Sequence, residues 1–190
     1  MSKFSDNHFS LIYKYKKLHL EGTSKLSPSQ TFAGYSLEKW IHEIKKIITH
    51  NEYKSLLDYG CGKALLYHNK LSIADKIFNN ICDFWNVEDF FLYDPAVESY
   101  SEHPDKKKDM VICTDVIEHL SPQDCQLVLE DIFNLAEKHV FISVDIKPAS
   151  KFFENGENIH TCLKSKEEWE KIFSDFYYLY PNIQQDIRIK

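Results

Sequence analysis

The chain has 190 residues, of which 43% are hydrophobic and 14% aromatic, as expected for one globular domain and not for a disordered or fibrous chain. The formal net charge of -6, from 29 acidic and 23 basic side chains, argues against a dominant nucleic-acid-binding surface. The five cysteines are scattered without zinc-site spacing, and we expect reduced thiols in a cytoplasmic protein. The N-terminal sequence lacks the apolar centre of a signal peptide, and no apolar run is long enough to cross a membrane.

The first half of the chain predicts two strands and two helices. Apolar residues at helical spacing predict an amphipathic helix over 36–51, and a short strand follows over 53–58. Glycines interrupt the pattern directly after this strand. Residues 71–85 again have helical spacing, and the apolar run 89–93 predicts a second strand.

The second half continues the alternation. Residues 96–108 are too few for both a helix and a strand of an ordinary crossover, and we expect mostly loop there. Buried strands are expected at 110–113 and 140–144, with a helix from Ser121 to Lys138 between them. A capping box made by Ser165 and Glu168 starts another helix, and 177–189 predicts a final hairpin.

Strands that alternate with helices and are apolar on both faces predict an α/β fold with a parallel sheet flanked by helices. Such a sheet binds ligands at the carboxyl ends of its strands. On this interpretation the functional residues share one cleft at those ends, and they are Asp58, Gly60, Gly62, Asp94, Asp115 and the residues after Asp145.

The glycine turn after the first strand indicates the kind of ligand. Gly60 and Gly62 let a ligand approach the backbone, and the Asp58 carboxylate can accept hydrogen bonds from an ammonium group. A dinucleotide fingerprint is disfavoured because Leu65 occupies the third glycine position and Asp58 would repel a pyrophosphate. Asp94 can accept from two ribose hydroxyls, so the pattern favours an aminoacyl nucleoside.

Three motifs in this order resemble those of the class I S-adenosylmethionine-dependent methyltransferases. They are residues 57–62 (Leu-Asp-Tyr-Gly-Cys-Gly), 93–95 (Tyr-Asp-Pro) and 109–120, which includes Asp115, Glu118 and His119. The resemblance spans roughly 32–173 and implies a doubly wound, mostly parallel, Rossmann-like sheet with a reversed C-terminal hairpin. It also implies S-adenosylmethionine as cofactor, with its methionine end at Asp58, Gly60, Cys61 and Gly62, its ribose at Asp94, and Asp115 nearby.

The chain departs from the family pattern in two places and is therefore similar to its compact variants. Ala64 replaces a third glycine, and only fourteen residues separate Asp94 from Asp109, which removes the usual site of an adenine contact. Shortened members that resemble this chain carry an asparagine and a histidine after the fifth strand, and Asn158 and His160 stand in that place.

The resemblance implies methyl transfer to an oxygen or nitrogen atom, without a metal. His160 or His119 would take the proton of the acceptor, although a hydrogen-bonded surface histidine is the simpler interpretation of His160, and Asp115, Glu118 and His119 could equally be a polar helix entrance. Residues 1–35 would pack on or cap the cofactor site of a single domain over 36–190.

Several alternatives to this function stay open. The acidic balance favours a small-molecule or sugar acceptor over RNA, although an RNA methyltransferase is an alternative. The chain could also be a non-catalytic domain that binds S-adenosylmethionine or S-adenosylhomocysteine, or it could use the cofactor for cleavage or aminopropyl transfer.

Overall fold

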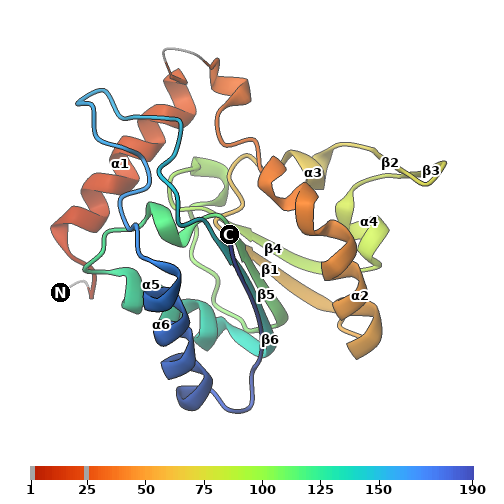
Figure 1. Ribbon diagram of the computed structural model, residues 1–190. Helices are drawn as coiled ribbons and strands as arrows, with labels where there is room; N and C mark the ends of the chain where they lie inside the picture. Colours follow the sequence, from red (N-terminus) through yellow and green to blue (C-terminus); the bar gives the residue numbers. More distant parts are fainter. Residues whose placement is uncertain (1–2, 24–25) are drawn as a thin grey trace.

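A computed structural model describes residues 3–23 and 26–190 of the chain. Its centre is a five-stranded sheet with helices around it (Figure 1). The strand order is β4-β1-β5-β6-β7, and all neighbouring strands are parallel. The predicted parallel sheet is confirmed. The strands are β1 (Ser55–Tyr59), β4 (Asp89–Tyr93), β5 (Lys108–Thr114), β6 (Ala136–Val144) and β7 (Gln184–Ile189).

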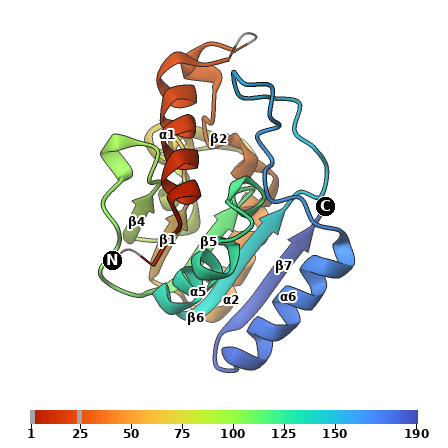
Figure 2. The same cartoon turned by 90° about the vertical axis from the view of Figure 1, so that its left-hand side faces the viewer.

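Helices cover both faces of the sheet (Figures 1 and 2). They are α1 (Asp6–Glu21), α2 (Ile41–Asn51), α3 (Leu65–His68), α4 (Ile81–Trp85), α5 (Cys125–Leu135) and α6 (Lys166–Leu179), with 3-10 turns at Pro28–Gln30, Tyr35–Trp40, Glu98–Tyr100 and Ile117–His119. Successive strand residues face opposite sides, so Val111 packs with α5 and α6, whereas Met110 and Ile112 pack with α2 and α4. No helix in the described ranges is both long and apolar enough to span a membrane.

The predicted C-terminal hairpin is wrong. Residues 177–179 belong to α6, whose core side chains Trp169, Phe173 and Phe176 continue the helical spacing begun at the Ser165 capping box. Because α6 carries the chain back along the sheet, β7 enters from the same end as β6 and pairs with it in parallel.

The helix expected over 71–85 is also mostly wrong. The segment contains a small antiparallel hairpin of β2 (Leu71–Ile73) and β3 (Lys76–Phe78), and only α4 is helical. Ala74 and Asp75 both have positive φ, which is the backbone conformation of a tight hairpin turn. The helix expected over 121–138 corresponds to α5, which is shorter than predicted. The segment 96–108, expected to be mostly loop, contains one 3-10 turn and reaches β5 at Lys108.

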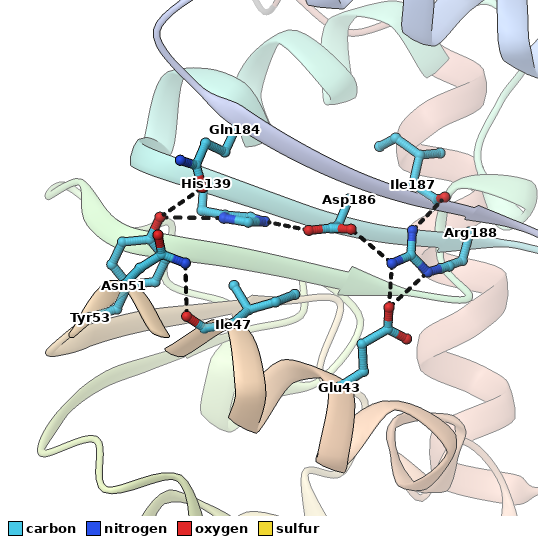
Figure 3. A network of polar contacts seen from close by, with 9 residues as sticks. All are labelled: Glu43, Ile47, Asn51, Tyr53, His139, Gln184, Asp186, Ile187 and Arg188. Carbon is cyan, nitrogen blue, oxygen red and sulfur yellow. Dashed lines mark hydrogen bonds and ion pairs between the residues drawn. The ribbon is translucent and has the colours of Figure 1, made fainter. Parts of the chain in front are cut away.

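A polar network anchors the edge strand β7 to the rest of the fold (Figure 3). Arg188 donates to Glu43 of α2 and, at 2.7 Å, to Asp186. The Asp186 carboxylate lies 3.1 Å from Nε2 of His139 on β6, and the other ring nitrogen lies 3.3 Å from the hydroxyl of Tyr53. These contacts join α2, β6 and β7 along one edge of the sheet.

Candidate functional site

One cavity lies where the carboxyl ends of β1, β4 and β5 meet. Gly60 and Gly62 follow β1, Asp94 follows β4 and Asp115 follows β5, and all four residues line this cavity. The chain lays down β4 on one side of β1 and then β5 on the other side, so the order of strands reverses between β1 and β5. Open α/β sheets bind ligands at such a switch point. We refer to this space as the switch-point cavity.

The glycine turn is held in a conformation that only glycine fits. Gly60 has a φ of +86°, and a Cβ atom there would lie 2.4 Å from the side chain of Val116. A Cβ atom at Gly62 would lie 2.5 Å from the carbonyl oxygen of Phe32. Ala64, at the position of the missing third glycine, itself has a left-handed φ of 53°. The backbone therefore retains the shape of a glycine loop despite the alanine.

Asp94 connects this loop to the end of β4. Its carboxylate accepts hydrogen bonds from the backbone N–H groups of Gly62 and Ala96, both at 2.9 Å. Burial raises the pKa of Asp94, and the two hydrogen bonds act in the opposite direction. Asp94 thus lines the cavity and also fixes the geometry of the glycine turn.

Two predicted cofactor residues are not among those lining the cavity. The carboxylate of Asp58 is buried and accepts a hydrogen bond from Tyr67 at 2.8 Å, and burial raises its pKa to about 7. The thiol of Cys61 is buried as well, and its backbone N–H donates to the carbonyl of Tyr93. All five cysteines are free. Asp58 and Cys61 therefore support the turn from behind.

Asp115 directly follows β5, which pairs with β1 on the side opposite to β4. It has a φ of 57°, and its carboxylate accepts from Ser143 at 2.6 Å and pairs with Lys190 at 2.5 Å. It lines the switch-point cavity and also a neighbouring groove. Asp115 therefore marks the boundary between two spaces.

One face of helix α1 forms a wall of the switch-point cavity. The sequence predicts residues 1–35 near the site but not which of their side chains line it. The lining side chains of α1 follow helical spacing and are His8, Leu11, Ile12, Tyr15 and His19. This spacing was present in the sequence, but nothing local indicated what the face would cover. Figure 2 shows α1 beyond the carboxyl ends of the strands.

The adjacent groove contains the predicted catalytic histidines. It is lined by Asp115, Glu118, His119, Asp145, Lys151 and His160, among others. The rings of His119 and His160 meet edge to face with centroids 4.7 Å apart. Burial is the largest cause that lowers the pKa of His119, to about 3, so this imidazole is neutral and a weak proton acceptor.

Glu118, which precedes His119, is fully buried. One carboxylate oxygen accepts from the backbone N–H of Asp145 at 3.0 Å, and burial raises the pKa of this side chain to about 8. Asn158, from the same predicted motif as His160, accepts from the backbone N–H of His160 and holds both N–H and C=O of Ala149. Asn158 therefore positions the loop that carries His160.

Two carboxylates, those of Asp94 and Asp115, line the switch-point cavity, whereas no lysine or arginine is among its lining residues in the described part of the chain. Lys190 pairs with Asp115 from outside the lining, and among the described residues Asp94 has only backbone N–H groups as hydrogen-bond partners. Aromatic and aliphatic side chains make up most of the remaining wall. Such a site suits a ligand with a cationic group and an apolar body, and it disfavours a phosphate.

Comparison of the chain with protein-family models and with curated protein sequences gives no match. The family resemblance therefore depends on the three sequence motifs alone.

Proposed function

We propose that this chain is an S-adenosylmethionine-dependent methyltransferase that binds its cofactor in the switch-point cavity. The observation that carries the proposal is the meeting of Gly60, Gly62, Asp94 and Asp115 in one cavity that no lysine or arginine of the described residues lines. The ligand would bring a sulfonium and an ammonium group to a site lined by two carboxylates.

The proposed reaction is an in-line displacement. The acceptor oxygen or nitrogen attacks the methyl carbon, the carbon–sulfur bond breaks, and the sulfonium becomes a neutral thioether. Because the methyl group is already activated, the residues of the chain mainly align the two partners and exclude water. Helix α1 would provide much of that exclusion, since its side chains form one wall of the cavity.

The groove beside the cavity is the proposed entry for the acceptor. Asp115 and His119 line both spaces, so a molecule in the groove would lie next to the reacting end of the cofactor. The groove has mixed charge and contains Lys151 besides its acidic residues. These features favour a small polar acceptor such as a sugar. Of the two histidines, His160 is the better candidate base, because the low pKa of His119 makes it a poor one.

Calorimetric titration with S-adenosylmethionine and S-adenosylhomocysteine tests this proposal. We expect micromolar binding that is weakened at least tenfold in Asp94→Asn and unchanged in Asp105→Asn, which alters an exposed loop carboxylate. Absence of binding by the parent chain to either compound would refute the proposal. Binding without methyl transfer across a broad acceptor screen would instead favour the non-catalytic binding domain.

A further inference from the structure

Three potential metal ligands meet in the groove. One ligand atom each from Glu118, His119 and His160 lies within 4.8 Å of the others. Atoms that share one ion at about 2.1 Å can be at most about 4.2 Å apart, so movements below about 1 Å would bring all three to one ion. We propose that Glu118, His119 and His160 bind a divalent first-row transition-metal ion, a site that the sequence analysis did not predict.

The state of both imidazoles fits this role. Nδ1 of His119 lies 3.1 Å from the carbonyl oxygen of Ile159, and Nδ1 of His160 lies 2.6 Å from that of Lys147. A carbonyl oxygen only accepts, and the hydroxyl of Tyr15, which also lies 3.1 Å from Nδ1 of His119, donates at 2.5 Å to the carbonyl of Ile159. These contacts assign the proton to each Nδ1 and leave a lone pair on each Nε2. Metal-binding histidines typically have this arrangement, with the second nitrogen donating to a carbonyl or carboxylate.

Glu118 supplies the second, independent observation. Its side chain is fully buried, and its Oε2 atom has no hydrogen-bond partner among the described residues. Its other oxygen is held by the N–H of Asp145, which fixes the carboxylate in place. A buried carboxylate oxygen without a partner is costly unless a proton or a cation compensates it.

The ligand set indicates the class of ion. Two imidazoles and one carboxylate are typical of zinc and other first-row ions, whereas magnesium and calcium prefer oxygen ligands alone. Three protein ligands leave at least one coordination position open, as in catalytic sites. That position would face the groove and suit an oxygen atom of a bound molecule. The site itself does not depend on methyl transfer, but if the proposed function holds, the ion would hold the acceptor and both histidines would be ligands instead of bases.

Metal binding can be measured on the whole chain after chelator treatment. We expect one Zn²⁺ or Co²⁺ per chain by calorimetry, and a visible Co²⁺ spectrum without sulfur-to-cobalt charge transfer. Glu118→Gln keeps an acceptor for the N–H of Asp145, and His160→Ala alters a partly exposed loop residue, so both variants should fold. Each variant should bind the metal ion at least about 100-fold more weakly than the parent does. Loss of a residue that only hydrogen-bonds to a ligand typically weakens metal binding about 10- to 100-fold, so a larger loss indicates a direct ligand.

His68→Ala is the matched control, because His68 lies outside the cluster and stacks on Tyr100. It should bind the ion as the parent does. The proposal is overturned if the parent binds neither ion at micromolar concentration, if the two cluster variants bind as tightly as the parent, or if a charge-transfer band assigns the ion to thiolates. None of these outcomes bears on binding of S-adenosylmethionine, which is measured separately.

Discussion

Replacement of Asp94 by alanine should destabilise the protein even without a ligand. The carboxylate accepts from the N–H groups of Gly62 and Ala96, both at 2.9 Å, and both donor residues are buried. A buried donor left without a partner costs about 1–3 kcal/mol, so two donors predict a loss of about 2–6 kcal/mol. Asp94→Asn keeps one acceptor oxygen, and we expect about half of that loss.

Urea denaturation measures this effect, with the free energy of unfolding obtained at an unchanged m-value. Asp105→Ala removes an exposed loop carboxylate and should change stability by no more than about 0.5 kcal/mol. A loss below about 1 kcal/mol in Asp94→Ala would show that the two N–H groups find other partners, and the argument would fail. The result also decides how a loss of cofactor binding in an Asp94 variant is interpreted. A collapsed glycine turn would weaken cofactor binding as effectively as the loss of a hydrogen bond to the ribose.

Three further predictions concern the residues around the cavity. The pKa of Asp58 is raised to about 7, so between about pH 4 and 7 the native state holds a proton that the unfolded chain has released. This side chain therefore contributes a fall of stability as pH rises over that range, and Asp58→Asn should remove that contribution from the slope of melting temperature against pH, making the slope more positive than that of the parent. An unchanged slope would contradict this. Gly60→Ala should lose about 1–3 kcal/mol more than Gly156→Ala, since both have positive φ but only Gly60 meets Val116, and Val116→Ala should restore part of the difference. Finally, S-adenosylhomocysteine should slow amide exchange in α1 but not in α6, and equal exchange in α1 despite measurable binding would place the ligand elsewhere.

The sequence predicted the sheet because burial on both faces leaves a clear pattern. The strand predicted at 89–93 coincides with β4, and the capping box at Ser165 starts α6. The prediction was wrong where local preference and tertiary context differ. Tyr177 and Tyr178 have high strand propensity but complete a helix that already packs through Phe173 and Phe176.

The candidate site was predicted in part for the same reason. Glycines and carboxylates at strand ends can be located from a strand prediction, and Gly60, Gly62, Asp94 and Asp115 do share a cavity. Whether a side chain of the turn faces the cavity or the protein core depends on packing. The sequence therefore did not predict that Asp58 would be buried and hydrogen-bonded to Tyr67. The cluster of Glu118, His119 and His160 depends on how the loop between β6 and α6, which carries His160, folds back over the end of β5, and no local pattern specifies this.

The walls of the switch-point cavity differ in how firmly they are held, and this difference bears on ligand entry. The floor consists of residues that end strands of the main sheet, so moving it would break the ladder between β1, β4 and β5. Helix α1 instead packs on a small separate core around Leu11, Leu18 and Phe153, supported by exposed ion pairs such as Lys17 with Glu154. Exposed pairs contribute only about 0–1 kcal/mol each. Displacement of α1 would also break the hydrogen bonds of Tyr15 to Ile159 and of Ser5 to Asp124, but it would leave the strand ladder intact. It is therefore the way to open the cavity that preserves the sheet, and a ligand held by the floor would enter past α1.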